Sequence, residues 1–388
     1  MTSNCIHSDA RTTVRVSARR FETSPFQDRW LTPETVMGVY AGRYYSVFNG
    51  EDVEAAYWAL RRRAVLYDVP ERPVEISGPD AERFLDHVFA RRVSDLKVGR
   101  GRYCIACTHR GHLFMDGILF RLGERRYWYV QPDGALETWL LAHSAGFDVT
   151  VIDPHAWVLQ IQGPTSPAIL RAASAGAVDE RMGYFHAGFV EIAGQEVYVS
   201  RTGWTGELGY EIYTLGPATD CGALWDHLVS AGRPHGMVVG SIASMGIRRI
   251  EAGILDNGTD FDLSMTPFEA GLGGFVDLGK EQFIGRAALL EADRGKRLFG
   301  VKCPDAAPGY RQPIRDGDGI VGHVTAGAWS PYLQAGIGYA RFDTPGNWVG
   351  QRLTTTTADG DDLGCEVVDL PFYDTEKRIP RGLATSIP

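Results

Sequence analysis

Two segments of the chain repeat one pattern, and this repeat restricts the possible folds more than any other feature. Val74–Leu85 has the sequence VEISGPDAERFL, and Leu159–Leu170 has the sequence LQIQGPTSPAIL. In each segment a short alternating run stops at Gly-Pro, where the proline presets a turn. An Asp or a Thr then offers a cap for a following helix. Each segment therefore predicts a strand, a turn and a helix, in that order.

The repeat continues downstream of both segments. An aromatic strand is expected at 126–130 in one copy and at 196–200 in the other, followed by helices at 135–144 and 219–231. Strands and helices that alternate in this way are typical of the split βαβ arrangement, in which helices cover one face of a mixed or antiparallel sheet. We therefore expect two related α+β halves.

The last third of the chain has a different pattern. Short alternating runs, each bounded by Gly, Pro or Asp, occur at 298–302, 319–325, 336–340 and 351–357. Such runs are typical of a β-barrel or β-sandwich. We place the boundary between Arg286 and Arg297, where a helix expected over 287–293 precedes this β module. At the other end, residues 1–18 are polar and are expected to be loose.

Composition and charge exclude several classes of protein. A chain of 388 residues with 44% hydrophobic residues is long enough for two or three domains, each with its own core. Its formal net charge of -9 argues against a nucleic-acid partner, because phosphate backbones attract basic faces. Since no apolar run has the length of a membrane span and the start lacks an apolar secretory segment, we expect no membrane association and a cytoplasmic location.

The six cysteines are sparse and scattered, unlike those of a disulfide scaffold. Cys104 and Cys107 have the C-x-x-C spacing that supplies half of some zinc sites, but no second C-x-x-C completes it. Because apolar residues surround this pair, we interpret both as packing thiols and predict no metal site.

A glycine-rich segment, Arg201–Tyr213 (RTGWTGELGYEIY), combines three glycines with the carboxylate of Glu211. A phosphate-binding loop is rejected, because G-x-x-x-x-G-K-[ST] is absent and no helix follows directly. The local pattern alone favours a tight hairpin between two strands, with the glycines supplying positive φ.

The same segment resembles the R-T-G-Y-T-G-E-D-G-F-E-I signature of glycine-cleavage aminomethyltransferases. Three further motifs follow in the same order, resembling R-L-E-A-G, T-P-x-E-A-G-L and F-x-G-[KR]; they are Arg249–Gly253, Thr266–Leu272 and Phe283–Arg286. The likeness extends from about Phe21 to Arg378. The chain is therefore identified by resemblance as a member of the glycine-cleavage T-protein superfamily.

This resemblance implies a three-domain cloverleaf with a tetrahydrofolate pocket through its middle. The implied fold class is α+β, with two related split βαβ halves and a C-terminal β-barrel or sandwich. The expected domains are a first folate-binding α+β domain, a second α+β domain and a β module, over 19–55 with 150–245, 56–149 with 246–290, and 291–388.

The resemblance also implies residues that bind the cofactor. A pterin edge presents an amino group and a ring N–H side by side, so one carboxylate accepts both, and Glu211 occupies the matching position. Arg249 corresponds to the family arginine that helps to hold folate, for which the alternative is a surface salt bridge with Glu251. Trp204 and Tyr103 are candidates for contact with a cationic methyl donor through their π faces, with core packing as the alternative.

The candidate catalytic residue is Asp116. Gly111–Leu119 resembles G-G-x-x-D-D-x-x-V, but Met115 replaces the first Asp of that motif. An ether donor would also need a proton source, for which Asp116, His109, His112 and Tyr103 are candidates.

The departures from the aminomethyltransferase pattern favour another branch of the superfamily. Met115, Trp204 and the N-terminal half resemble tetrahydrofolate-dependent demethylases such as dimethylsulfoniopropionate demethylase. We therefore predict an enzyme that moves a methyl group from a small S-, O- or N-methyl donor to N5 of tetrahydrofolate, mainly by alignment of the reacting groups.

Two alternatives remain. One is an aminomethyltransferase of glycine-cleavage type, which would need a lipoyl carrier protein as partner. The other is a non-catalytic folate-binding accessory protein; such relatives carry K-G-C-x-x-G-Q, whereas Lys280–Arg286 has no cysteine. A fusion with a flavin oxidase is rejected, because no dinucleotide fingerprint precedes residue 100.

Overall fold

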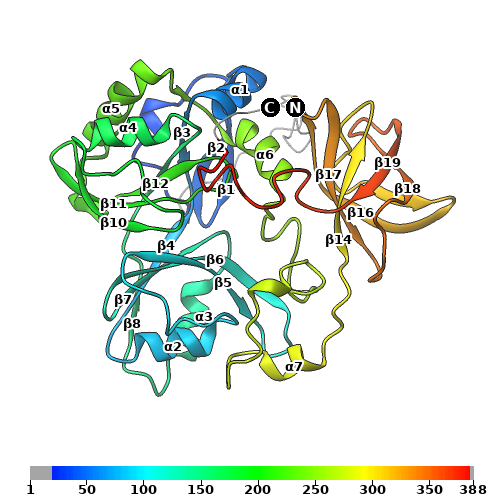
Figure 1. Cartoon of the computed structure of the whole chain (residues 1–388), viewed down its shortest axis with the longest axis horizontal. Helices are drawn as coiled ribbons and strands as arrows, with labels where there is room; N and C mark the ends of the chain where they lie inside the picture. Colours follow the sequence, from blue (N-terminus) through cyan, green and yellow to red (C-terminus); the bar gives the residue numbers. More distant parts are fainter. Residues whose placement is uncertain (1–19, 385–388) are drawn as a thin grey trace.

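The computed structural model describes residues 20–384. The predicted loose arm, residues 1–18, lies outside these residues. The described chain forms three lobes, two built on open sheets and one on a barrel, around a central helix, α6 (Figure 1). The predicted α+β class with a C-terminal β-barrel is therefore confirmed. No helix within residues 20–384 has the length and apolar character needed to cross a bilayer.

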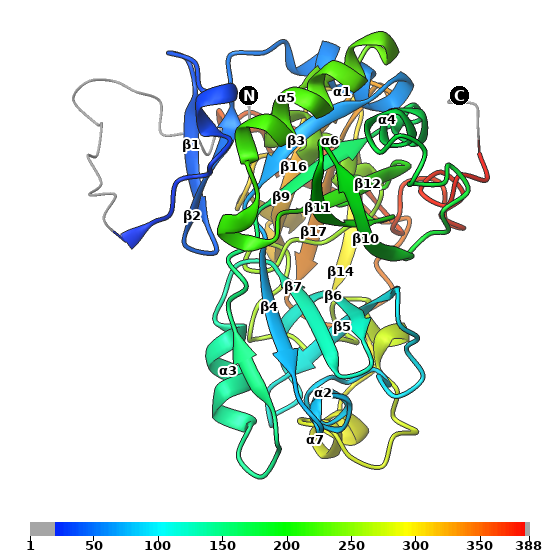
Figure 2. The same ribbon diagram turned by 90° about the vertical axis from the view of Figure 1, so that its left-hand side faces the viewer.

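The first sheet has six strands in the order β10-β11-β12-β9-β3-β13. Their bounds are Ala187–Ile192, Gln195–Ser200, Gly209–Tyr213, Val158–Gln162, Val65–Val69 and Val238–Val239. Helices α4 (Ser166–Ala173) and α5 (Cys221–Gly232) cover one face, where Leu170 and Leu224 pack with Ile161 in one hydrophobic cluster. Helix α1 (Val53–Arg62) precedes β3, and the hairpin β1 (Val36–Tyr40) and β2 (Arg43–Phe48) lies beside the sheet (Figure 2).

The second sheet has five strands in the order β5-β6-β7-β4-β8. Their bounds are Arg100–Cys107, Leu113–Gly123, Arg126–Gln131, Arg72–Ser77 and Thr150–Ile152. Helices α2 (Ala81–Val88) and α3 (Leu136–His143) pack on it through Phe84, Leu85 and Leu140. Strand β3 leads into β4 through only two residues, so the chain passes directly from one sheet to the other.

The strand–turn–helix repeat is present in both sheets, as β4-α2 and β9-α4. The glycine of each Gly-Pro turn has a strongly positive φ, +131° at Gly78 and +123° at Gly163. A Cβ atom would lie 2.5 Å from a backbone oxygen at the first position and 2.4 Å at the second. Close approach of the backbone therefore requires glycine at both turns.

The predicted correspondence of the downstream strands was wrong. The strand that pairs with β4 and leads into a helix is β7 (126–131), and its counterpart beside β9 is β12 (209–213), not β11 (195–200). Both β11 and β12 are short strands that contain tyrosine, Tyr198 in β11 and Tyr210 and Tyr213 in β12, so the local pattern does not distinguish them. The division of the chain into domains stays a prediction, although pairing places β3 in the first sheet and β8 in the second.

The uncovered faces of the two sheets pack against each other. Phe120 and Trp128 of the second sheet contact the rings of Tyr198 and Tyr213 of the first, with ring centroids 5.6–6.0 Å apart. Such edge-to-face pairs add about 0.5–1.5 kcal/mol each to the area they bury. The candidate site described below lies near the edge of this interface.

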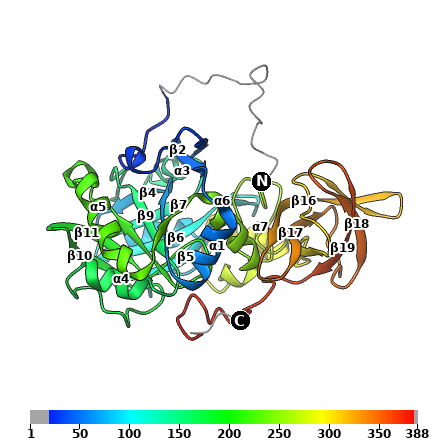
Figure 3. The same cartoon turned by 90° about the horizontal axis from the view of Figure 1, so that it is seen from above.

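The third lobe is a closed six-stranded barrel in the order β14-β17-β16-β15-β18-β19. Its strands are Leu298–Cys303, Ala335–Phe342, Gly319–Ser330, Pro313–Asp316, Arg352–Thr356 and Asp362–Val368. Helix α7 (Arg286–Glu291) precedes it, as predicted. Seen from above, the barrel lies at one end of the molecule and the two sheets lie at the other (Figure 3).

A buried ionic cluster joins the lobes around α6 (Ile242–Glu251). Glu207 accepts from Arg248 at 2.7 Å and faces Arg61 at 3.2 Å, and Arg61 also contacts Glu251 at 3.3 Å. Three further side chains donate to Glu251, from α1, from the barrel and from the C-terminal segment, namely Tyr57, Ser330 and Tyr373. Two arginines therefore balance two glutamates where the lobe of the first sheet meets the barrel.

Candidate active site

The Glu211 carboxylate lies in the first sheet, where strand register surrounds it with donors. Ser200 of β11 and Gln160 of β9 are its direct partners on the two neighbouring strands. Oε2 accepts hydrogen bonds from Thr202 at 2.5 Å and from Tyr213 at 2.6 Å, and Oε1 accepts one from the Gln160 amide at 3.1 Å. Oε1 therefore keeps more free acceptor capacity than Oε2.

Burial and hydrogen bonding act in opposite directions on Glu211. Burial raises the pKa of its carboxyl, because the charged form is desolvated, and the hydroxyl donors of Thr202, Tyr213 and Ser200 oppose this rise. The segment before β12 is an eight-residue loop, 201–208, between antiparallel strands. The predicted hairpin is thus confirmed, but it is not a tight one.

Asp116 and Tyr103 are brought together across adjacent strands. Asp116 lies on β6 and Tyr103 on β5, and the Tyr103 hydroxyl donates to Oδ2 of Asp116 at 2.8 Å. Asp116 is only 8% exposed, and its Oδ1 atom is buried without a hydrogen-bond partner. Burial raises the pKa of Asp116 to about 6, the Tyr103 hydroxyl opposes the rise, and the nearby Asp256 carboxyl adds to it.

Met115 occupies the position at which the aminomethyltransferase motif has its first Asp. Its side chain is 1% exposed and packs in the core of the second sheet with Leu119, Tyr129 and Leu136. This position therefore contributes packing and no charge, so Asp116 is the carboxylate that the motif retains.

Arg249 has a different partner from the alternative considered above. Its guanidinium is buried and pairs with Asp260 at 2.5 Å, whereas Glu251 pairs with Arg61 and lies near Arg248. The surface salt bridge with Glu251 is therefore wrong. Consecutive residues of a helix face different directions, so Arg248 pairs with Glu207 whereas Arg249 pairs with Asp260.

Trp204 connects the surroundings of Glu211 with Arg249. Its backbone N–H points to the side-chain oxygen of Gln160 at 3.5 Å, and Gln160 donates to Glu211. The guanidinium carbon of Arg249 lies 5.3 Å from the centre of the Trp204 ring, within cation–π range. Trp204, itself a predicted cofactor-binding residue, is thus placed between two others, Glu211 and Arg249.

The histidines considered as proton sources lie elsewhere. His109 packs against Trp139 and His143 of helix α3, with ring centroids 6.3 and 5.4 Å apart. His112 belongs to the turn between β5 and β6, where its backbone N–H points to Thr108. Among the other three candidates, Tyr103 is therefore the one with a hydrogen bond to Asp116.

Several residues of this region were not predicted from the sequence. Asp256 lies in the loop after α6 and is electrostatically coupled to both Arg249 and Asp116. Tyr40, at the end of β1, is coupled to Asp256, Asp116 and a further carboxyl, Glu71. Asp256 follows the R-I-E-A-G motif by three residues, which was a usable signal, but nothing in the sequence pointed to Tyr40.

The C-x-x-C pair packs in two different cores. Cys104 belongs to the core of the second sheet and Cys107 to the cluster between that sheet and the barrel. Burial raises the pKa of each thiol to about 12. Packing thiols are therefore confirmed, and no group of three or more metal-ligating side chains was found within residues 20–384.

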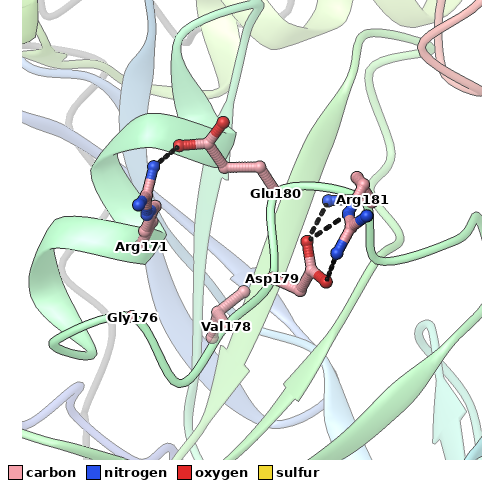
Figure 4. Close-up of a pocket in the computed structure, with 6 residues that line it drawn as sticks. All are labelled: Arg171, Gly176, Val178, Asp179, Glu180 and Arg181. Atoms are coloured by element: carbon pink, nitrogen blue, oxygen red, sulfur yellow. Dashed lines mark hydrogen bonds and ion pairs between the residues drawn. The ribbon is translucent and has the colours of Figure 1, made fainter.

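A shallow surface recess lies over the end of α4 and the loop that follows it (Figure 4). Its charged side chains neutralise one another, because Arg171 pairs with Glu180 at 3.1 Å and Arg181 pairs with Asp179 at 3.0 Å. None of the predicted site residues lines this recess.

Comparison with known proteins decides the family. Residues 32–280 match the family model of the GCVT N-terminal domain, and residues 296–374 match that of the glycine cleavage T-protein C-terminal barrel domain. The chain belongs to the glycine cleavage T-protein family. The structure of the aminomethyltransferase T of Bartonella henselae superimposes with a TM-score of 0.81 and 27% identity, over 91% of this T-protein family member and 98% of that chain.

Curated relatives carry more than one name. Aminomethyltransferases of Lysinibacillus sphaericus and Streptomyces avermitilis are 31% and 34% identical, each over 82% of this chain and 89% of the relative. A trimethylamine-oxide aldolase of Ruegeria pomeroyi is 32% identical over 84% of this chain, which corresponds to 43% of that protein. These relatives are enzymes, and this T-protein family member is an enzyme as well.

The residues present fit the folate ligand that the family implies. Glu211 supplies a buried carboxylate with acceptor capacity on Oε1, and Oδ1 of Asp116 is a buried polar atom without a partner. A buried polar atom of this kind costs about 1–3 kcal/mol unless a ligand satisfies it. The region thus offers acceptors for the N–H groups of a pterin.

Proposed function

We propose that this chain is a tetrahydrofolate-dependent methyltransferase that removes a methyl group from a small S-, O- or N-methyl donor. Bound tetrahydrofolate would supply N5 as the nucleophile that accepts the methyl group. Glu211 would hold the pterin edge, and Arg249 and Trp204 would line the same pocket. The single observation that carries the proposal is the exchange of the first motif carboxylate for Met115, buried in the core beside a retained Asp116.

The charges around Asp116 favour a cationic donor. Asp256 adds to the negative potential there, the Tyr103 hydroxyl donates to Asp116, and the Tyr40 phenol is electrostatically coupled to both carboxyls. A sulfonium or quaternary ammonium group is attracted by carboxylates and by π faces alike. Such a donor also needs no proton, because a neutral group leaves when the methyl is transferred. The Ruegeria pomeroyi relative, whose name specifies trimethylamine oxide, supports a donor with methylated nitrogen.

The residues of the chain would act mainly by alignment. Holding nucleophile, methyl group and leaving group in line is worth about 7–11 kcal/mol in favourable intramolecular cases. The hydrogen bond from Tyr103 fixes the orientation of the Asp116 carboxyl, so the charge that faces the donor is held in place. Arg249, paired with Asp260, brings no free cation to compete with the donor.

A second function is aminomethyl transfer of glycine-cleavage type, which the names of the Lysinibacillus and Streptomyces relatives favour. It would require a lipoyl carrier protein that presents the aminomethyl group. Under this alternative Asp116 would act alone, because Met115 replaces the neighbouring carboxylate of the motif.

The test is anaerobic incubation of the enzyme with tetrahydrofolate and a panel of donors. The panel contains a sulfonium, a quaternary ammonium, an aryl methyl ether and an N-methyl glycine, and 5-methyltetrahydrofolate is followed by chromatography. We expect product with a cationic donor. If none of the donors reacts while an aminomethylated lipoyl carrier yields methylenetetrahydrofolate, the methyltransferase proposal is overturned.

A further inference from the structure

Glu71 lies at the crossing between the two sheets. It is the second of the two residues between β3 of the first sheet and β4 of the second. Its backbone carbonyl accepts a hydrogen bond from Nη1 of Arg43 at 2.9 Å, which fixes the chain at this point. The position brings Glu71 to the seam between the lobes, where the candidate site lies.

One oxygen of the Glu71 side chain has no hydrogen-bond partner in the protein. This atom, Oε2, is completely buried. The nearby guanidinium of Arg43 pairs with Glu22 through Nε at 3.2 Å and stacks on Trp157 at 3.9 Å, and its Nη2 atom is likewise buried without a hydrogen-bond partner. A buried carboxyl oxygen without a partner is costly, so a bound ligand is a natural candidate to satisfy it.

Glu71 is electrostatically coupled to both parts of the candidate site. On one side it is electrostatically coupled to Glu211 and to Tyr213, which donates to Glu211. On the other side it is coupled to Tyr40, which is also coupled to Asp116. A ligand that reaches from Glu211 to Asp116 would therefore pass Glu71.

The protonation state of Glu71 determines whether its carboxyl can donate a hydrogen bond. Burial raises its pKa to about 8, with Glu211 and then Asp68 adding to the rise and Arg43 opposing it. The phenols of Tyr40 and Tyr213 face it as well and are neutral at this pH. At neutral pH Glu71 is therefore mostly a neutral acid, which donates one hydrogen bond, and it loses this donor as the pH rises through about 8.

We propose that Glu71 is a second pterin-contacting carboxyl, which donates a hydrogen bond from its acid group to the ring carbonyl oxygen. A pterin edge presents an amino group, a ring N–H and a carbonyl oxygen in a row. Glu211, as an acceptor, suits the first two groups, and a neutral acid beside it suits the third. This assignment rests on the proposed folate function and adds a pH-dependent residue to it.

The experiment measures binding of tetrahydrofolate by anaerobic calorimetry at pH 6.5, 7.5, 8.5 and 9.5. For the unaltered enzyme we expect affinity to fall about tenfold across this range, as Glu71 ionises. Glu71→Gln keeps an amide donor at every pH, so its affinity should change less than twofold. Glu71→Met, of similar length but without a donor, should bind about tenfold more weakly at pH 6.5 and show no pH dependence.

Two results would overturn the assignment, and they differ from failure of the folate proposal. If the enzyme binds tetrahydrofolate and Glu211→Ala abolishes binding, but Glu71→Met binds like the unaltered enzyme, Glu71 does not contact the ligand. If Glu71→Gln keeps the original pH profile, another group titrates and the assignment also fails. Absence of any tetrahydrofolate binding to the unaltered enzyme would remove the folate function itself. Thermal unfolding of each variant verifies that the binding data come from folded protein.

Discussion

At the scale of single residues, the Glu211 carboxylate has a structural role as an acceptor and, under the proposed function, a ligand-binding role as well. Replacing it by alanine removes the acceptor for the pterin, so we expect tetrahydrofolate affinity to fall at least about tenfold, since hydrogen bonds to charged groups contribute about 1.5–3 kcal/mol. It also leaves Thr202, Tyr213 and Gln160 without their acceptor. A lower free energy of unfolding should therefore accompany the lost affinity.

The matched control for this change is Glu196→Ala, which removes an exposed carboxylate from the neighbouring strand β11. Calorimetric titration with tetrahydrofolate and urea unfolding should leave this control within error of the unaltered enzyme. Equal affinity of both variants would contradict the role assigned to Glu211.

The raised pKa of Asp116 predicts that the stability of the protein depends on pH. Its pKa is about 6 in the folded protein and 3.8 without burial, so the folded state binds more protons between these values. The stability associated with the neutral acid is fully present below about pH 3.8 and is lost as the pH rises through about 6; a shift of this size corresponds to about 3 kcal/mol. Asp116→Asn should thus be about 1–3 kcal/mol more stable than the unaltered enzyme at pH 7.5, with a difference that shrinks toward pH 4.5.

Urea unfolding at these two pH values measures this effect, and a pH-independent difference would contradict it. The same variant should lose most methyl-transfer activity, because the amide carries no negative charge to face a cationic donor. Higher stability with lower activity is the combination expected for a buried group retained for function.

Residues that stand in motifs could be singled out from the sequence, and their roles stay predictions, whereas residues placed by tertiary contact could not be singled out. Glu211 and Asp116 stand in motifs, and their burial follows from the strands that carry them. The Asp260 partner of Arg249 was missed because side chains eleven positions apart meet only through the loop after α6. Glu71 and Tyr40 lie in no motif, and their proximity arises from the crossing of two sheets.

At the scale of secondary structure elements, the two Gly-Pro turns are the most constrained points. Gly163→Ala forces a Cβ atom to within 2.4 Å of the Arg63 carbonyl oxygen at a φ of +123°. Strain and overpacking each cost about 1–3 kcal/mol, so we expect a clear loss of unfolding free energy. Gly188→Ala, on β10 with no atom within 4 Å of the added Cβ, is the control and should change stability little. Urea unfolding compares the two, and similar values would show that the turn tolerates a side chain.

The helices and strands were predicted more accurately than their mutual relation. Helices at 135–144 and 219–231 and the strands of the barrel are present close to their expected positions. The mistaken match of β7 with β11 has a physical cause: periodicity reports that a strand is half-buried, but not which neighbour it pairs with. The pairing depends on the loop 201–208, because this loop is long enough to let β12 pair with β9.

At the scale of the whole molecule, the buried cluster of Arg61, Glu207, Arg248 and Glu251 couples the lobes. Removing one charge leaves its partners buried and unbalanced, so Arg248→Met should destabilise the protein by about 3–5 kcal/mol. Glu180→Ala removes the exposed partner of Arg171 (Figure 4) and should cost less than about 1 kcal/mol. Denaturant unfolding provides both values, and a small effect of Arg248→Met would show that the lobes do not depend on this cluster.

The C-terminal segment supplies Tyr373 to this cluster, where it contacts both Arg61 and Glu251. Arg61 and Tyr373 are 312 positions apart, so their contact closes a loop that contains most of the chain. On a ribosome, the two sheets and α6 emerge long before this tyrosine does. The junction of the lobes therefore lacks one of its hydrogen-bond donors until residue 373 has left the ribosome, and it is completed after the two sheets have been made.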